Sequence, residues 1–397
     1  MLASRTMKVY RLLSRPIVKL LLVACIVLSA YVVSSPLLSS QPALAKGSEP
    51  PFAAKLRPLL EAKMKELRVP GAIIHIHYPA QGSWTTTMGT RNLATGAPMN
   101  VNSHMRIGSI TKTFTATVIL QLVDEGKLGL NDPVSKYFPE VPNGSNITIR
   151  EVLNMTSGLF DYTEDEGLFK TVLAHPDKVW DPWELLTIAF QHPAYFAPGQ
   201  SLHYSSTNYI LLGLLIEQIT HMPVEKVFQQ RIFRPLGMHN TLLPPLSSAA
   251  IPNPHPIGYF FETSNAAAPL DVTSWNPSWG WTAGSAISTL HDLKIWAKAL
   301  ETGTLLSAAT QKERLTWVKF PGATWIGHFY GYGLGIADFG GMIGHDGGLP
   351  GFQSFMGYLP QKQATIVVLT NLDPAPDGSE PADALEMVIQ ENLQLFA

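Results

Sequence analysis

The sequence contains almost no cysteine, and this scarcity excludes several kinds of chemistry. Cys25 is the only cysteine in 397 residues, so beyond that position we expect no disulfide, thiolate zinc site or cysteine nucleophile. Charged residues make up 15% of the chain, its formal net charge is −2, and no basic patch indicates a nucleic-acid partner. The G-x-S-x-G motif of doubly wound serine hydrolases and the H-E-x-x-H motif of zinc peptidases are also absent.

The first 45 residues differ in kind from those that follow. Five basic residues, from Arg5 to Lys19, precede an apolar run at 20–33, and no acidic residue occurs before Glu49. The run is shorter than the roughly 20 residues that span a bilayer, and the alanines of "ALA" at 43–45 supply a small-x-small cleavage site. This layout predicts a signal peptide at 1–45 and an extracytoplasmic location, periplasmic or secreted. An uncleaved membrane anchor and lipidation at Cys25 are the alternatives.

The order of apolar patterns in residues 46–397 indicates two lobes. Alternating patterns predict strands near both ends of this region, within 70–100 and 331–372. Three- and four-residue spacing predicts helices at 110–123, 185–190, 209–220 and 224–233, one that stops at Gly303, and one from Pro381. One lobe is therefore expected to be a sheet formed from both ends, and the other a helical insertion.

A lysine occupies an unusual place in the stretch "RIGSITKTFTATVILQLVDEGK" at 106–127. The spacing predicts a buried helix closed by Gly126, yet Lys112 falls in the first turn, where the helix dipole disfavours a cation. Ser109 lies one turn earlier on the same helix face. A buried lysine that loses its proton can accept one from a serine hydroxyl, and the helix N-terminus favours an oxyanion. The alternative is an N-cap serine beside a lysine that reaches solvent, and the stretch alone leaves both interpretations open.

Two histidines, His75 and His77, share one face of a predicted strand. Such a pair can bind a metal, but no acidic residue or third histidine accompanies it in the sequence. We therefore interpret both as strand-packing residues and predict no metal site.

Two further clusters of polar residues follow Ser109 and Lys112 in the sequence, around Tyr204 and His345. Tyr204 lies in the polar stretch "HYSSTN" before an apolar helix, and His345 ends a strand and is followed by Asp346 and two glycines. With the "SITK" of Ser109, these clusters resemble the S-x-x-K, Y-x-N and H-T-G elements of the serine β-lactamase-like family, nearest to class C β-lactamases and D-alanyl-D-alanine carboxypeptidases. The resemblance covers about residues 69–372.

This resemblance implies an α+β fold with two lobes and a site in the cleft between them. An antiparallel sheet flanked by helices would use about residues 51–108 and 281–397, and an all-helical lobe would use about residues 109–280. Together they would form one hydrolase domain at 46–397.

The resemblance also implies a role for each matching residue. Ser109 would be the nucleophile, and Lys112 would take or relay its proton. Tyr204 would hand a proton to the leaving group, with phenolate character supported by nearby cations. The backbone N–H groups of Ser109 and Gly348 would form the oxyanion hole, and His345 would add polarity on the strand side.

Three departures from the family pattern concern the binding of substrate. Ser206 replaces the asparagine of Y-x-N and offers a shorter side chain, while Asn208 is expected to point elsewhere. Asp346 replaces the threonine of H-T-G, and an ionised aspartate would repel the carboxylate of a peptide or β-lactam. Ile336, Ala337 and Asp338 occupy the place where the carboxypeptidases carry an arginine, a residue suited to binding a terminal carboxylate. We therefore expect intact acyl-transfer groups with weakened carboxylate recognition.

Other cleft positions follow from the same resemblance. Gly347 lacks a side chain and would let backbone groups approach the substrate closely. Phe169, Thr171 and Trp279 fall where the carboxypeptidases have cleft-wall residues, with packing in the core or between lobes as the alternative.

The sequence as a whole predicts an exported serine hydrolase that forms an acyl-enzyme on Ser109. We expect a D-alanyl-D-alanine carboxypeptidase-like or β-lactamase-related peptidase or amidase, acting on a small molecule, peptide or ester, with peptidoglycan as one source. Covalent catalysis by serine requires no cofactor. An esterase of the same fold is one alternative. A non-catalytic penicillin-binding-like sensor, suggested by Ser206 and Asp346, is an alternative from another class.

Overall fold

The computed structural model describes residues 49–319 and 329–392. The predicted signal peptide at 1–45 lies outside these residues. Residues from Ser48 onward form one compact unit. Within the described part of the chain, none of the helices combines the length and the apolar character that a membrane crossing requires.

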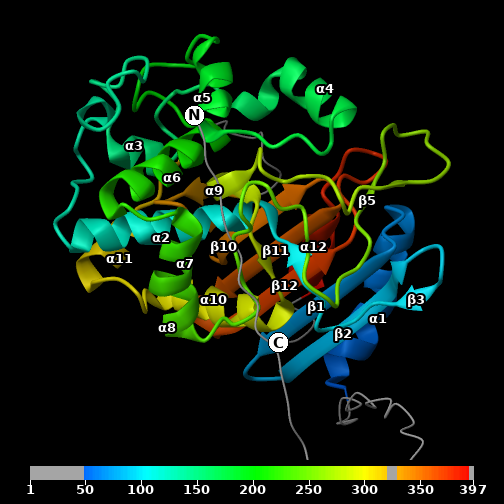
Figure 1. The fold of residues 1–397 in the computed structure, drawn as a ribbon. Helices are drawn as coiled ribbons and strands as arrows, with labels where there is room; N and C mark the ends of the chain where they lie inside the picture. Colours follow the sequence, from blue (N-terminus) through cyan, green and yellow to red (C-terminus); the bar gives the residue numbers. More distant parts are fainter. Residues whose placement is uncertain (1–48, 320–328, 393–397) are drawn as a thin grey trace, which may run out of the picture. The chain divides into compact units, whose positions relative to one another are not determined.

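An antiparallel sheet joins the two ends of the described chain (Figure 1). Among the described residues it has eight strands, in the spatial order β3 (Ala97–Pro98), β2 (Gly82–Asn92), β1 (Gly71–Tyr78), β12 (Ala364–Thr370), β11 (Phe352–Leu359), β10 (Ile343–Leu349), β9 (Ala337–Asp338) and β8 (Gly331–Tyr332). β1 and β12 are neighbours, with Ala72 opposite Thr370 and His77 opposite Thr365. The predicted sheet from both ends is therefore confirmed.

The two histidines of β1 bind hydroxyl groups of the neighbouring strand. His75 Nδ1 lies 2.7 Å from Thr85 Oγ1, and His77 Nδ1 lies 2.7 Å from Ser83 Oγ. Burial lowers the pKa of His75 to about 3, so its ring stays neutral. These contacts support the interpretation of both residues as part of the strand packing.

Helices cover both faces of the sheet. α1 (Pro51–Glu66) and α12 (Pro381–Asn392) contact each other, and α10 (Leu290–Thr302) packs on β11 and β12 (Figure 1). Gln353 of β11 accepts a hydrogen bond from the N–H of Ala382 in α12, whereas Ser354 donates to the Ile107 carbonyl at 2.9 Å. Because successive strand residues point to opposite faces, α12 and the segment before α2 lie on opposite sides of the sheet.

The middle of the chain is mainly helical, as predicted. Its helices are α2 (Thr111–Asp124), α3 (Ile149–Leu153), α4 (Glu166–Ala174), α5 (Pro182–Phe190), α6 (Ser206–Thr220), α7 (Val224–Phe228) and α8 (Arg234–Leu236). Two further helices, α9 (Trp281–Gly284) and α11 (Ala308–Arg314), follow later in the sequence. Short helical turns are η1 (Gly108–Ile110), η2 (Val134–Lys136), η3 (Tyr162–Glu164), η4 (Gln229–Phe233) and η5 (Pro360–Lys362). Two small ribbons pair β4 (Met105–Arg106) with β7 (Ile287–Ser288) and β5 (Tyr259–Phe260) with β6 (Leu270–Asp271).

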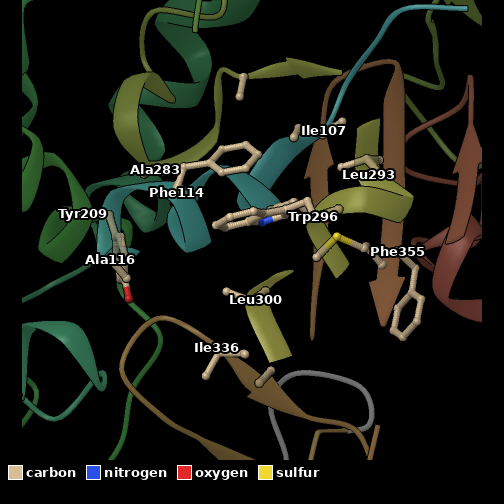
Figure 2. Packing of buried hydrophobic residues seen from close by; sticks show 14 of the residues in the cluster. Ile107, Phe114, Ala116, Tyr209, Ala283, Leu293, Trp296, Leu300, Ile336 and Phe355 are labelled. Carbon is tan, nitrogen blue, oxygen red and sulfur yellow. The ribbon is translucent and has the colours of Figure 1, made fainter. Parts of the chain in front are cut away.

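Helix α2 is the predicted buried helix. It ends at Asp124, and Gly126 follows with a φ of +67°, which confirms the predicted glycine stop. The Phe114 ring lies 4.8 Å from that of Trp296 in α10 and 5.1 Å from that of Phe233 (Figure 2). Truncating a phenylalanine packed in this way typically costs about 3–5 kcal/mol. The core therefore holds α2, and with it the turn that carries Ser109, in a fixed position.

Candidate active site

Ser109 lies in η1, the turn that leads into α2, and is half-buried. Its side chain caps neither the turn nor the helix, so the N-cap interpretation is wrong. Gly108 has a φ of +49°, and a Cβ there would lie 2.6 Å from Gly348 N. A Cβ on Gly347 would lie 2.5 Å from Ser109 N. Glycine at both positions therefore lets the turn touch the backbone of β10, bringing together the two chain segments that carry the predicted oxyanion donors.

Lys112 is 1% exposed, and its Nζ lies 2.9 Å from Ser109 Oγ. The same Nζ donates to the Ala283 carbonyl at 2.9 Å. Burial lowers the pKa of Lys112 to about 7, although the Asp161 and Asp346 carboxylates act in the opposite direction. At neutral pH much of Lys112 is therefore an uncharged amine beside a serine hydroxyl, which is the condition that proton transfer from Ser109 requires.

Ser206 begins α6 and faces the same lysine. Its Oγ lies 3.4 Å from Lys112 Nζ, a longer contact than that of Ser109. Asn208 points away, as predicted, because its Oδ1 accepts from Ser157 Oγ at 2.7 Å. The sequence analysis missed Asp161, which is buried, lines the cavity and accepts a hydrogen bond from the backbone N–H of Ser206. Burial raises the pKa of Asp161.

Tyr204 is adjacent to Ser109. Its hydroxyl is hydrogen-bonded to the Ser109 side chain, and Lys112 Nζ lies 4.6 Å from the centre of its ring. Burial, followed by the negative charge of Asp346, raises the pKa of Tyr204 well above its usual value. The predicted phenolate character is therefore wrong, because burial and then the nearby carboxylate charge disfavour the phenolate. As a neutral phenol, Tyr204 can donate a proton.

His345 and Asp346 are adjacent in β10, and their side chains are in contact, with His345 Nδ1 3.1 Å from Asp346 Oδ1. The His345 ring is buried, with Nε2 2.9 Å from Tyr332 Oη and Nδ1 2.7 Å from the Asp346 carbonyl oxygen. His345 therefore supports the strand and, contrary to expectation, does not line the cavity. Asp346 does line it, and it pairs across the sheet with Phe355, on the face toward α12.

A cavity of about 920 Å³ opens above Ser109. It collects most of the predicted site residues: Ser109, Lys112, Phe169, Tyr204, Ser206, Trp279, Asp346, Gly347 and Gly348. Thr171 lies outside the wall, and its hydroxyl donates to the Gly167 carbonyl within α4. The cavity also has an acidic side, formed by Asp373, Glu380 and Asp383, that the sequence analysis did not single out. The acid-rich segment at 371–386 was the available signal.

A lysine of lowered pKa beside a serine, at the start of a buried helix and next to a glycine-rich sheet strand, defines the class of serine hydrolases that work through an acyl-enzyme. The fold places the chain in one family of that class. The chain belongs to the Beta-lactamase family, whose model matches residues 56–389. This confirms the resemblance found in the sequence and the α+β fold that it implied.

Individual relatives differ in their named activities. Penicillin-binding protein 4* of Bacillus subtilis is 28% identical over 72% of this chain. This chain spans 64% of the length of that relative and 61% of the length of another relative from Bacillus subtilis. The D-alanyl-D-alanine-carboxypeptidase/endopeptidase AmpH of Escherichia coli is 26% identical over 73% of this chain and 77% of its own. A D-stereospecific amidohydrolase from Streptomyces sp. is similar in structure, with 33% identity, a TM-score of 0.75, and 85% of this chain and 97% of that chain covered.

Proposed function

We propose that this protein is an exported serine amidase that forms an acyl-enzyme on Ser109. The observation that carries the proposal is the 2.9 Å contact between Ser109 Oγ and Lys112 Nζ, together with the lowered pKa of that lysine. Export rests on the layout of residues 1–45 alone.

The contacts of these groups support a simple sequence of steps. Ser109 Oγ attacks the carbonyl carbon of the substrate as its proton passes to the neutral Lys112 amine. The N–H groups of Ser109 and Gly348 stabilise the oxyanion, and each such donor is typically worth about 3 kcal/mol. Collapse of the intermediate expels the amine, which takes a proton from Tyr204, and Lys112 restores that proton. Water then attacks the ester, with the same groups working in reverse.

The cavity walls favour an amide substrate without a carboxylate near the scissile bond. Asp346 stands where a hydroxyl would help hold a carboxylate, and it lines the cavity. Among the described lining residues there is no arginine, the residue best suited to grip a carboxylate. The similarity to a D-stereospecific amidohydrolase supports amides as the class. A peptide ending in a free D-alanine carboxylate would therefore be a poorer substrate than an uncharged amide.

Covalent labelling tests the nucleophile. We expect a fluorophosphonate to add one adduct to the full chain by intact-mass spectrometry, and Ser109→Ala to abolish that adduct. Amino-acid p-nitroanilides should be hydrolysed by the wild type only. An adduct that persists in Ser109→Ala would contradict the assignment, and a chain that neither reacts nor turns over would favour the sensor alternative.

An esterase on the same site is the second candidate, because the loss of carboxylate-binding groups would suit it equally well. Short-chain p-nitrophenyl esters and p-nitroanilides with matched acyl groups separate the two. Turnover of the esters alone would favour the esterase.

A further inference from the structure

The charge on the cavity wall is strongly unbalanced. Lys112 is the only basic residue among the described residues that line the cavity, and its pKa of about 7 leaves about half of it uncharged at neutral pH. Three acids, Asp346, Glu380 and Asp383, form one side, which we call the acidic wall. Asp373, which lies on the same acidic side, and three further acids also line the cavity: Asp161, Glu164 and Glu262. Such a cavity attracts cations and repels anions.

The acidic wall is assembled by the fold from two distant segments. Asp346 projects from β10 on the face toward α12, Glu380 precedes the first residue of α12, and Asp383 lies in its first turn. One carboxylate oxygen from each residue lies within 4.8 Å of those of the other two. The positive end of the α12 dipole favours one acid at this place, but three such neighbours repel one another unless protons or a cation intervene.

Asp383 provides independent evidence that a partner belongs at the wall. The residue is 4% exposed and its side chain is hydrogen-bonded to that of Glu380, but its Oδ1 is buried without a hydrogen-bond partner among the described residues. A buried carboxylate oxygen in this state is costly and calls for a ligand that donates to it. Glu380 is held in place at the wall by Gln353 Nε2, which lies 3.3 Å from Glu380 Oε2.

Two acids of the wall, Asp383 and Glu380, have raised pKa values. Burial, followed by the charge of Asp346, raises the pKa of Asp383 well above its usual value. Burial also raises the pKa of Glu380. A cation that enters the wall would take the place of these protons and supply Asp383 Oδ1 with a partner.

We propose that the acidic wall binds a primary ammonium group of the substrate, so that the enzyme selects amides that carry a free amino group. This inference rests on the proposed function, because the wall lines the same cavity as Ser109. The rest of the cavity is partly apolar, with Phe169, Phe260 and Trp279 on its wall. A ligand with an ammonium group and an apolar side chain on one small scaffold matches both parts. An apolar amino-acid amide with a free amino group is such a molecule.

Matched substrates test this selection. Phenylalanine p-nitroanilide with a free amino group is compared with its N-acetyl form, for both enantiomers, and the readout is the ratio of their kcat/KM values. We expect a ratio of about ten or more in favour of the free amine, expressed mainly in KM. Asp383→Asn and Glu380→Gln should each lower this ratio several-fold. Glu386→Gln, which removes a buried α12 carboxylate outside the cavity lining, is the matched control and should leave the ratio unchanged.

Two results would overturn the proposal. One is a wild-type ratio of one or less. The other is an equal loss of turnover of both substrates in the wall variants, which is the signature of a structural role. Thermal melting checks that each variant folds, and if Asp383→Asn does not, Asp346→Asn carries the same test from the strand side of the wall.

Binding without turnover separates this inference from the proposed function and from a metal ion. Ser109→Ala is titrated calorimetrically with phenylalaninamide, with N-acetylphenylalaninamide, and with Ca²⁺, Mg²⁺ or Zn²⁺ alone. Amine binding that the acetyl form lacks, and that Asp383→Asn abolishes, supports the inference even if no substrate is turned over. Metal binding that depends on Asp383, with no amine binding, would assign the wall to a metal ion and overturn the ammonium assignment.

Discussion

The two sides of the cavity bury charge in opposite ways. On the helix side, burial lowers the pKa of Lys112 to about 7 and favours an uncharged amine beside Ser109. On the side of the acidic wall, burial raises the pKa of Asp383, with the charge of Asp346 adding to the effect. The same physical cause, the cost of placing a charge in a low-dielectric region, thus favours the neutral form of a base at one wall and of an acid at the other. The first side follows the family pattern, whereas the second departs from it.

This difference indicates which part of the site is open to change. The base, the nucleophile and the oxyanion donors must meet at one point, so η1, α2 and β10 are packed closely enough that two glycines are required. The strand side only has to fit the substrate. An aspartate in place of a hydroxyl there changes the charge that a substrate meets, and its charge also raises the pKa values of Lys112 and Tyr204.

The largest expected effect comes from the base itself. Lys112→Met keeps the apolar stem and removes the amine, and we expect kcat/KM for a p-nitroanilide to fall by about 10³-fold. In the wild type, kcat/KM should rise with pH through about 7, because the neutral form of Lys112 accumulates above its pKa. Rate profiles between about pH 5.5 and 9 check this. A kcat/KM that does not change across that interval would mean that Lys112 does not act as the base, and the contrast between the two sides of the cavity would no longer hold.

The next effect tests the contact between the two sides. Gly347→Ala places a Cβ 2.5 Å from Ser109 N and 2.3 Å from the Ile107 carbonyl oxygen, so the strand and the nucleophile turn must separate. We expect kcat to fall by about 10²-fold, as when an oxyanion donor is displaced. Gly96→Ala is the control, because a Cβ at that turn meets no atom within 4 Å and its φ of +67° adds backbone strain only outside the cavity lining. Similar losses in both variants would contradict a specific role for the Gly347 contact.

A smaller change should move the strand side toward the family pattern. Asp346→Thr removes one carboxylate from the acidic wall and restores a hydroxyl beside Gly347. We expect the ratio of kcat/KM for N-succinyl over N-acetyl phenylalanine p-nitroanilide to rise by about tenfold. Asp346→Asn, which removes the charge alone, shows how much of the gain is electrostatic. If neither variant changes the ratio, Asp346 does not govern the selection against carboxylates.

Local patterns in the sequence predicted the nucleophile side well. Ser109, Lys112 and Tyr204 lie in short motifs whose spacing relates directly to helix geometry, and the structure brings all three together. The charge state of Tyr204 could not be predicted in the same way. It depends on burial and on Asp346, which is remote in sequence.

The strand side was only partly predictable. The sequence indicated a helix from Pro381 and an aspartate at 346, and both are present. It could not indicate that α12 starts opposite β10, because that contact depends on which sheet face the helix covers. Although the two side chains of His345 and Asp346 are in contact, the His345 ring is hydrogen-bonded to Tyr332, whereas Asp346 lines the cavity. The prediction that Thr171 forms part of the cavity wall was wrong for a similar reason, because its hydroxyl donates to the Gly167 carbonyl within α4.

The smallest expected effect on activity concerns Glu386, the buried α12 acid outside the cavity lining, which is 0% exposed. Burial raises its pKa from 4.5 to about 8. Between these values the folded chain holds a proton that the unfolded chain has released, so the contribution of Glu386 to stability is full below about pH 4.5 and is lost as the pH rises toward 8. Each unit of pKa difference corresponds to roughly 1.4 kcal/mol.

Glu386→Gln keeps the shape of the protonated acid and cannot ionise, so it should remove this pH dependence and leave activity unchanged. We expect the free energy of unfolding to fall less between pH 5 and pH 8 in Glu386→Gln than in the wild type, by a few kcal/mol, as measured by urea unfolding at both values. The charge of Glu386 also contributes to the raised pKa of Asp383, so the difference between the two proteins includes this coupling. Equal losses in both proteins would mean that Glu386 ionises without penalty in the folded chain. Burial on α12 would then not favour the neutral form of this acid, and the contrast with the lowered pKa of Lys112 would no longer hold.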